Sequence, residues 1–349
     1  MLKSLHLVNF TVFSDVEFRF GRNLNVFVGE NGSGKTHLLK AIYTGLAVNN
    51  RVAAGKAHLQ QALAAKLMGV FRPDSLGRLV HRTRGRSKCS ADYRFDDSGL
   101  DLAYSFSTLA ESEVTLKQSP TASLEKAPAY LPTRELLTIF PGFVSLYETT
   151  YLSFEETWRD TCILLGAPLA RGPRETTIKK LLHPLEEAMG GKVELDGSGR
   201  FYLRHEAGKI EMHLLAEGLR KLATLARLIA TGSLLDKGYL FWDEPEANLN
   251  PRIIKSLAKT ILQLAQGGIQ VFLATHSLFL LRELHILQSQ QFQDLDSWCV
   301  GLHPDGQGGV AVEQGKSMDD IGSIVALDEE LQQSDRYIDT EMGLSVSVR

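Results

Sequence analysis

The pattern of apolar and polar residues predicts strands that alternate with helices near both ends of the chain. The strands, indicated by period-two alternation or by short apolar runs, cover residues 5–8, 16–20, 24–28, 239–242 and 271–274. The helices include one that runs through residue 46 and others at about 216–231 and 251–264. Alternating strands and helices of this kind are typical of an α/β core.

The middle of the chain has a different pattern and is predicted to form an inserted lobe. It is helical at residues 57–68 and mostly helical from 143 to 190, and a hairpin turn is expected at residues 96–99. Its short strands are predicted at residues 91–95, 102–106, 113–116, 193–195, 201–203 and 209–213. We therefore expect the following division: a core of residues 1–50 and 212–300, a helical and antiparallel-β lobe at 51–211, and an acidic C-terminal segment at 301–349.

A glycine-rich sequence joins the strand at residues 24–28 to the next helix. Its residues are Gly29, Glu30, Asn31, Gly32, Ser33, Gly34, Lys35 and Thr36, which match G-x-x-x-x-G-K-[ST]. Glycines let the backbone N–H groups curl around an anion, and the helix N-terminus adds positive potential. Lys35 is expected to reach the β- and γ-phosphates of ATP and Thr36 to ligate Mg²⁺, and the adjoining His37 completes the expected nucleotide-binding segment.

The apolar strand at residues 239–242 ends in two acidic residues. A buried strand holds Asp243 rigidly, so that its carboxylate can coordinate Mg²⁺ directly or through water. Glu244 is then placed to polarise the attacking water as general base. Apolar strands that end in acids are common, and only the phosphate-binding loop upstream gives this one a chemical meaning.

Residues 242–251 resemble the Walker B motif and the D-loop of ABC-type ATPases. The D-loop residues implied by this resemblance are Ala247, Asn248, Leu249 and Asn250. Residues 271–277 resemble the switch strand of the same family, which implies that His276 senses the γ-phosphate beside Glu244. The plain alternative for His276 is a structural histidine after a strand.

The ABC signature of this family precedes Walker B by one helix. The residues at that position are Leu215, Ala216, Glu217, Gly218, Leu219, Arg220 and Lys221. They depart from the familiar L-S-G-G-Q, because Ala216 replaces the serine and Glu217 the first glycine. In the family this segment caps the γ-phosphate bound to the opposite subunit. Gly218 and the helix N-terminus remain for that role here, and Arg220 or Lys221 is left to compensate for the lost hydroxyl. The alternative is an ordinary amphipathic helix start.

A second departure concerns the Q-loop, which in the family carries a glutamine. Residues 130–137 hold that place and contain no glutamine. Arg134 or Glu135 is left to sense Mg²⁺ or nucleotide in its stead. The alternative is that Pro132 and Thr133 merely cap a helix.

Taken with Asn9 and Phe10 in the first strand and with residues 23–28, the chain resembles SMC/RecF-like ABC-type ATPases more than membrane transporters. The two departures resemble the AAA_15/AAA_21 group, which includes ATPase subunits of bacterial defence operons such as Septu and PARIS. The resemblance covers residues 1–50 and 212–280. It implies a head-to-tail homodimer or higher oligomer that closes on ATP and regulates or scaffolds a separate effector protein in anti-phage defence.

Charge is distributed unevenly, although the net charge is only −3. Between residues 51 and 88, nine Lys and Arg stand against one acid, whereas between residues 294 and 349, twelve Asp and Glu stand against three bases. The stretch Arg72–Lys88 therefore predicts a phosphate-contacting surface, and a DNA-binding repair or maintenance ATPase of RecF/SMC type is the second functional hypothesis. Two solvated surfaces are the plain alternative.

Composition indicates the class of protein and the compartment in which it is expected. A content of 44% hydrophobic and 23% charged residues is that of a soluble globular protein, and no apolar run approaches the roughly 18–20 residues that span a bilayer. Cys89, Cys162 and Cys299 are widely spaced and odd in number, which argues against a disulfide framework or a zinc site. Without a signal-peptide pattern, we expect a cytoplasmic protein without membrane contact.

Two further classes are disfavoured. The long stretch between Lys35 and Leu215 exceeds what nucleotide-binding subunits of transporters have, so this function is the least favoured of the three. No nuclease site is expected, because no HxH, HNH or paired-acid pattern surrounds His81, His183, His205 and His213.

Overall fold

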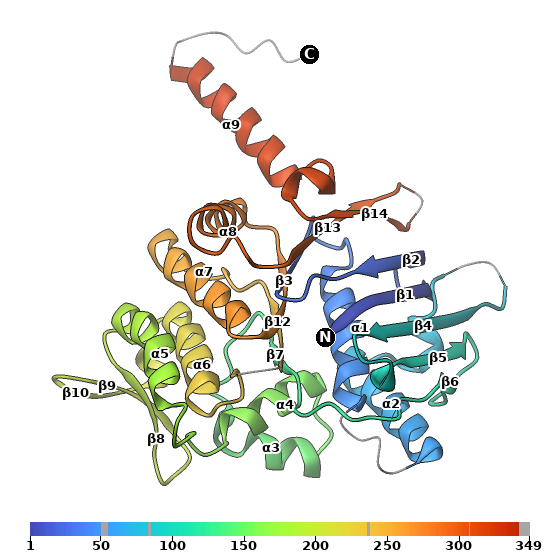
Figure 1. Ribbon diagram of the computed structural model, residues 1–349, viewed down its shortest axis with the longest axis horizontal. Helices are drawn as coiled ribbons and strands as arrows, with labels where there is room; N and C mark the ends of the chain where they lie inside the picture. The colour runs from blue at the N-terminus through green and yellow to red at the C-terminus, as the bar shows by residue number, and fades with distance from the viewer. Residues whose placement is uncertain (50–54, 83–84, 236–237, 307, 342–349) are drawn as a thin grey trace.

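The computed structural model describes residues 1–49, 55–82, 85–235, 238–306 and 308–341. Within these ranges the chain forms a central sheet and an antiparallel sheet on either side of one long helix, with further helices and a small sheet beyond the central sheet (Figure 1). Arg51, Arg84 and Arg349, which belong to the charge runs described above, lie outside the described residues.

The central sheet has the strand order β14-β13-β3-β12-β11-β7. Its strands are β3 (Leu24–Gly29), β7 (Ala129–Leu131), β11 (Gly238–Asp243), β12 (Ile269–Thr275), β13 (Ser297–Pro304) and β14 (Val310–Gly315). Neighbouring strands are parallel except for β13 and β14. The apolar runs that predict β3, β11 and β12 suit parallel strands, because both faces of such a sheet are covered.

Alternate residues of the central strands pack into two separate cores. Leu24, Val26 and Val28 of β3 lie in the core on one face, whereas Phe27 lies in the core on the other. The first face is covered by α6 (Glu217–Ala230), α7 (Pro251–Gln266) and α8 (Leu278–Gln291), and the second by α1 (Lys35–Asn49) (Figure 1). The period of two along the strand produces this division.

The antiparallel sheet has the order β2-β1-β4-β5-β6 and packs on the other side of α1. Its strands are β1 (Leu2–Phe10), β2 (Phe13–Arg19), β4 (Lys88–Phe95), β5 (Leu102–Ser107) and β6 (Thr115–Gln118). The predicted hairpin between β4 and β5 is confirmed, and at its turn Gly99 N–H donates to Asp97 Oδ1 at 2.9 Å. The helix α2 (Lys56–Phe71) and the 3₁₀ turn η2 (Leu76–Leu79) complete this side.

The remaining middle elements extend from the neighbourhood of α6 to that of α2 (Figure 1). They are α3 (Phe140–Thr149), α4 (Glu156–Leu165), α5 (Glu175–Met189) and a small sheet of order β10-β9-β8. The small sheet consists of β8 (Lys192–Leu195), β9 (Phe201–His205) and β10 (Gly208–Glu211), and the 3₁₀ turn η4 (Met212–Leu214) leads into α6.

The structure divides the chain differently from the expected domains. The segment 51–211 is not one inserted lobe, because β4 pairs with β1 of the first segment and β7 joins the central sheet beside β11. The expected boundary after residue 300 falls inside β13, which pairs with β3. Strand pairing between residues far apart in the chain leaves no local pattern in the sequence.

The C-terminal part begins with β14 and the 3₁₀ turn η5 (Met318–Ile321) and continues into α9 (Val325–Glu341). None of the described residues of α9 is buried, and the helix projects from the rest of the molecule (Figure 1). No helix in the described ranges combines the length and the apolar character that crossing a membrane requires.

Candidate functional site

Four neighbouring strands of the central sheet carry the predicted motifs at one edge. The phosphate-binding loop follows β3, His276 follows β12, Asp243 ends β11, and the segment expected to replace the Q-loop follows β7. These strands are parallel, so their carboxyl ends meet at the same edge. Ligands of open α/β sheets bind outside this edge.

The phosphate-binding loop has the conformation that its glycines predict. Gly32 and Gly34 have φ angles of 83° and 93°, which favour glycine. The Nζ atom of Lys35 donates to the carbonyl oxygens of Gly29 and Glu30 at 2.7 and 2.8 Å. Burial lowers the pKa of Lys35, whereas the nearby carboxylates of Glu244 and Asp243 raise it. The ammonium group is therefore held against the loop.

Other residues of the loop differ in exposure. Glu30, Asn31 and Gly32 are exposed, and Ser33 is buried. His37, in the first turn of α1, packs its ring 5.9 Å from that of Phe71 in α2, and burial lowers its pKa. Its Nδ1 atom is buried without a hydrogen-bond partner among the described residues.

Thr36 and Asp243 meet at the start of α1. The Thr36 hydroxyl donates to Asp243 Oδ2 at 2.8 Å. Burial raises the pKa of the Asp243 carboxyl, and the hydrogen bond from Thr36 opposes this effect. A buried carboxylate beside a hydroxyl fits Mg²⁺, which proteins commonly hold through one or two such oxygens together with substrate phosphates. In the described part of the chain, no group of three or more His, Cys, Asp or Glu could hold a metal ion by itself.

Glu244 and His276 lie beside each other. Glu244 Oε1 is 3.3 Å from His276 Nδ1, and the imidazole is about half exposed. Glu244 has a φ of 49°, which is unusual for a residue with a side chain. Its N–H donates to the carbonyl of Ala274 at 2.9 Å, which fixes the turn after β11 against β12. The carboxylate expected to act as base is thus next to the histidine expected to sense phosphate.

The signature segment packs against the D-loop of the same chain. Gly218 is buried, and a Cβ atom there would lie 2.6 Å from the carbonyl oxygen of Asn248 and 2.8 Å from Leu249 Cδ2. Asn250 caps α7 by accepting a hydrogen bond from Ile253 N–H at 3.0 Å. Ala216 precedes α6 and is exposed. Because Gly218 has no Cβ atom, the start of α6 can pack directly against the D-loop of the same subunit.

The two basic residues of the signature segment contact other motifs. Arg220 Nε is 3.0 Å from Glu135 Oε1, which also accepts a hydrogen bond from the Thr138 hydroxyl at 2.7 Å. Buried Lys221 donates to the carbonyl of Glu244 at 3.2 Å. Glu135 is therefore tied to the signature helix, whereas Arg134 is exposed.

Sequence reasoning missed a cavity of about 330 Å³ beside the phosphate-binding loop. Gly29, Asn31 and His276 line it, together with His303 of β13 and Ile324 before α9. The C-terminal part therefore borders the site, although no motif in residues 301–349 signals this position.

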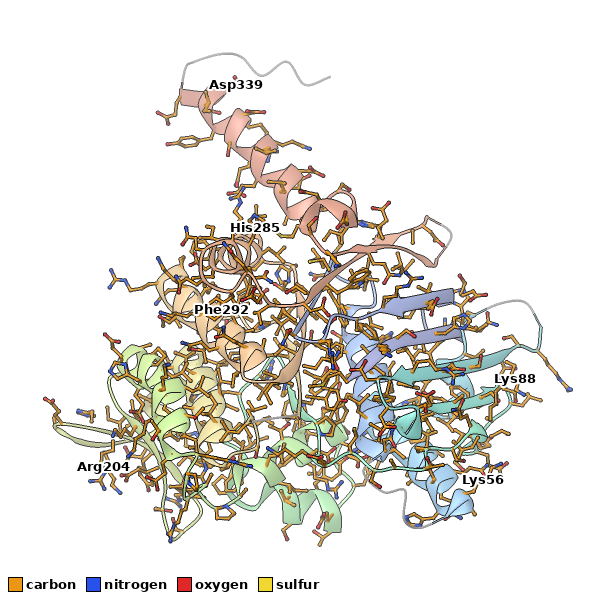
Figure 2. The ribbon with its side chains drawn as sticks, viewed as in Figure 1. Lys56, Lys88, Arg204, His285, Phe292 and Asp339 are labelled. Carbon is orange, nitrogen blue, oxygen red and sulfur yellow. The ribbon has the colours of Figure 1, made fainter. Side chains whose placement is uncertain are left out.

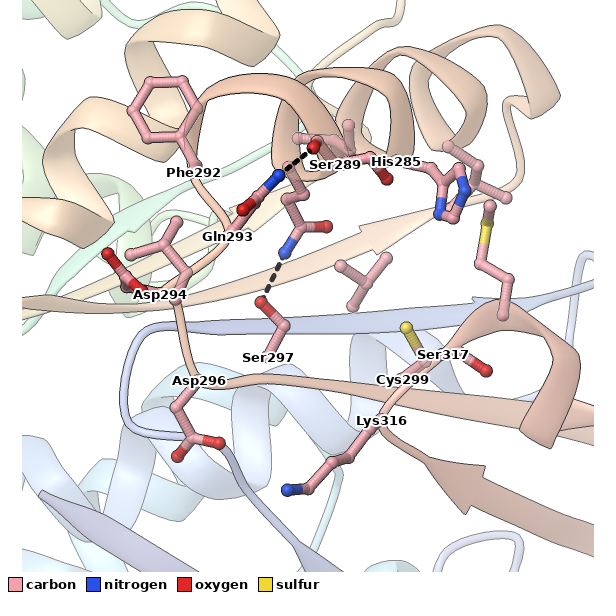
Figure 3. A pocket seen from close by; sticks show the side chains of 16 residues that line it. His285, Ser289, Phe292, Gln293, Asp294, Asp296, Ser297, Cys299, Lys316 and Ser317 are labelled. Carbon is pink, nitrogen blue, oxygen red and sulfur yellow. Dashed lines mark hydrogen bonds between the residues drawn. The ribbon is translucent and has the colours of Figure 1, made fainter.

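A second cavity, of about 540 Å³, lies between α8 and the strand β13 (Figure 3). Phe292, Cys299 and Met318 line it together with polar residues such as His285 and Lys316. None of the residues predicted to bind nucleotide lines this cavity, and it is separate from the candidate site.

The basic stretch is only partly available as a surface. Lys66 is buried in an ion-pair cluster, and Arg72 donates to the carbonyl oxygens of Leu152 and Phe154. The exposed basic residues in this region are Lys56, Arg78, Arg82, Arg86 and Lys88. Figure 2 shows Lys56 and Lys88 on the side formed by α2 and β4, away from Asp339 on α9.

Comparison with protein families gives one match over most of the chain. The family model AAA_21, described as "AAA domain, putative AbiEii toxin, Type IV TA system", matches residues 24–282. This range begins at β3 and extends past His276, so it contains every motif of the candidate site.

Curated relatives match shorter segments. The DNA replication and repair protein RecF of Streptococcus suis (strain 05ZYH33) is 32% identical over 98 residues, which cover 28% of this chain and 24% of that protein. RecF of Clostridium botulinum (strain Loch Maree) is 45% identical over 42 residues, or 12% of each protein. The chain thus matches about a quarter or less of the length of these relatives.

Solved structures resemble the whole chain. The Smc head bound to the C-winged helix domain of ScpA is 14% identical with a TM-score of 0.54, and the match covers 91% of this chain and 98% of that one. The Smc head with an extended coiled coil, bound to the C-terminal domain of ScpA derived from Pyrococcus furiosus, is 12% identical with a TM-score of 0.53. This match covers 96% and 99% of the two chains. At such identities the likeness concerns the fold.

Proposed function

Because this chain belongs to the AAA_21 family and is an SMC/RecF-like ABC-type ATPase with the fold of an Smc head, we propose that it hydrolyses ATP between two head-to-tail copies of itself. The observation that carries the proposal is the meeting of two pairs at one sheet edge. Thr36 lies 2.8 Å from Asp243, and Glu244 lies 3.3 Å from His276.

Each pair has a distinct chemical role. Thr36 and Asp243 hold Mg²⁺, which when bound neutralises charge on the phosphates of ATP. Lys35, which lies against the loop, adds a further positive charge there. Glu244 accepts a proton from water as the water oxygen attacks the γ-phosphorus and the bond to the ADP oxygen breaks. His276 contacts the γ-phosphate from the adjacent turn.

The second copy is inferred from what surrounds the signature segment. Leu214, directly before it, is 74% exposed, and Phe279, in the first turn after His276, is 44% exposed. In the proposed dimer, the second copy would cover these two apolar side chains. Ala216 and the N-terminus of α6 are likewise open to a second subunit, whose nucleotide they would cap.

The output of this cycle is proposed to be control of a separate effector protein in anti-phage defence. Support comes from the resemblance to ATPase subunits of defence operons and from the family description, which names a toxin of a toxin–antitoxin system. The exposed helix α9, whose root borders the nucleotide cavity, offers a route from nucleotide to effector.

Two substitutions test the proposed chemistry. Lys35→Ala removes the charge at the loop and should abolish ATP binding, measured by fluorescence of a labelled nucleotide. Glu244→Gln keeps the shape of the side chain but removes the base, so binding should persist while turnover falls at least about 100-fold, since general bases contribute about 10²–10⁴. The exposed controls Lys255→Ala and Glu329→Gln should change neither quantity. Normal hydrolysis by Glu244→Gln would refute the assignment of the base.

The exposed basic residues beside β4 support a second candidate function, a DNA-binding maintenance ATPase, because RecF relatives are named as replication and repair proteins. Changing Arg82, Arg86 and Lys88 together to Glu should weaken binding to duplex DNA at least tenfold. The wild-type affinity should fall steeply between about 50 and 200 mM salt. Duplex binding that is absent, or that survives the triple substitution, removes this candidate.

A further inference from the structure

Glu246 is a buried carboxylate that the proposed chemistry does not use. It lies two residues beyond Glu244 and is 8% exposed. Its Oε1 atom accepts a hydrogen bond from the Thr275 hydroxyl at 2.6 Å. Its Oε2 atom is buried and has no hydrogen-bond partner among the described residues. Burying a carboxylate costs free energy, so the buried position of Glu246 needs an explanation.

Thr275 is the last residue of β12 and is fully buried. Its hydroxyl donates to Glu246 and accepts a hydrogen bond from the backbone N–H of Ser277 at 3.0 Å. A hydroxyl can donate one bond and accept others, so both contacts form together. The Thr275 hydroxyl therefore links Glu246 to Ser277, the residue that follows His276. Ser277 in turn caps α8, because its hydroxyl accepts a hydrogen bond from Leu280 N–H.

The same two turns are joined a second time at Glu244. The Glu244 N–H donates to Ala274, and the Glu244 carbonyl accepts hydrogen bonds from Lys221 and from Ala247 N–H. The turn that bears Glu244 and the turn that bears His276 are thus connected at two points, one through the backbone and one through side chains.

We infer that Glu246 and Thr275 are positioning residues that keep His276 in register with Glu244. Neither contacts the reacting atoms, and their hydrogen bond acts on catalysis through the His276 turn. A hydrogen bond to a carboxylate is among the stronger hydrogen bonds in proteins, so this contact can select one conformation of the short turn. This inference rests on the proposed hydrolysis of ATP at Glu244.

Thr275→Val tests the inference because valine keeps the shape of threonine and removes the hydroxyl. The matched control is Thr260→Val, since Thr260 is also fully buried and its hydroxyl donates to Ser256 within α7. Thr275→Val should lower kcat at least tenfold and leave the Kd for ATP within twofold. Thr275→Ser, which retains the hydroxyl, should restore turnover, and Thr260→Val should have no effect. Equal turnover in the two valine variants overturns the inference, as does a loss confined to ATP affinity.

A double-mutant cycle asks whether Thr275 acts through His276. If it does, Thr275→Val should lower kcat much less in the His276→Ala background than in the wild type, because coupled residues are non-additive. A full, additive loss in that background contradicts the inference. Glu246→Ala removes the same hydrogen bond from the other side and should reproduce Thr275→Val, which serves as the second variant if Thr275→Val does not fold.

A spectroscopic measurement separates failure of the inference from failure of the proposed function. In protein with ¹³C-labelled histidine, the His276 ring resonance should shift or broaden in Thr275→Val and stay unchanged in Thr260→Val, with or without turnover. An unchanged His276 resonance in Thr275→Val refutes the positioning role. A wild-type protein that does not hydrolyse ATP refutes the proposed function, and the resonance still reports on the connection.

Discussion

Lys221 is a buried cation next to the residue proposed as general base. Burial lowers the pKa of its ammonium group, and the carboxylates of Glu217, Glu246 and Glu244 oppose this shift. The ammonium donates to the Glu244 carbonyl, in a turn whose φ of 49° is unfavourable for a side-chain residue. Lys221 therefore contributes to holding Glu244 in its unusual conformation.

Lys221→Met removes this donor at similar side-chain length. We expect kcat to fall about tenfold, because the Glu244 turn loses one of its fixed contacts, a change of about 1.4 kcal/mol. The free energy of unfolding should change little, since the cost of burying the charge is lost with the bond. Urea denaturation and steady-state ATPase assays measure the two effects, with the exposed Lys255→Met as control. Unaltered turnover would remove Lys221 from this role.

At the scale of elements, the helix that follows the phosphate-binding loop is tied to α4 by buried charges. Lys66 of α2 lies 2.9 Å from Glu156 and 2.6 Å from Asp160, and the Tyr43 hydroxyl of α1 donates to the same Asp160 at 2.6 Å. Lys40 of α1 pairs with Glu155. These contacts join α1, α2 and α4 into one unit.

Lys66→Met should destabilise the protein, because it leaves two mostly buried carboxylates, Glu156 and Asp160, with Arg159 as their remaining cation. Breaking a buried pair costs about 3–5 kcal/mol, and the remaining Arg159 contact with Glu156 places the expected loss near the lower value. Lys179→Met is the control, since Lys179 is exposed and pairs with Glu175 at 3.7 Å, which predicts a change below about 1 kcal/mol. Equal midpoints in urea for the two variants would contradict this account.

Local patterns predict the elements whose signal lies within a few residues. The apolar runs of β3, β11 and β12 and the hairpin between β4 and β5 agree with the structure because burial on both faces and turn chemistry act locally. The motif residues were identified in the same way. The motif residues come together because they follow parallel strands, whose carboxyl ends lie at the same edge of the sheet.

Elements that depend on distant partners escaped sequence reasoning. β7 has only three residues, and β13 and β14 owe their place to pairing with β3 and with each other. The contact of Lys221 with Glu244 and that of Thr275 with Glu246 join residues 23 and 29 positions apart in the chain, so no local spacing reveals them.

At the scale of the whole molecule, the basic and the acidic stretches of the sequence lie in different regions of the structure. The exposed bases lie beside β4, and the acidic helix α9 projects elsewhere (Figure 2). Lys66 and Arg72 leave the basic surface because Lys66 pairs with Asp160 of α4 and Arg72 donates to carbonyl groups in the loop between α3 and α4. The phosphate-binding loop, the signature segment and the start of α9 all lie near one edge of the central sheet, where the proposed closure of two copies would act on all three.

Light scattering of Glu244→Gln tests the central claim most directly, because this variant should bind ATP and retain it. With ATP and Mg²⁺ its mass should rise from that of one 38.6 kDa chain to twice that value, and with ADP it should remain single. Lys35→Ala should stay single under both conditions. A Glu244→Gln protein that binds ATP yet keeps the mass of one chain would contradict a site shared between two copies.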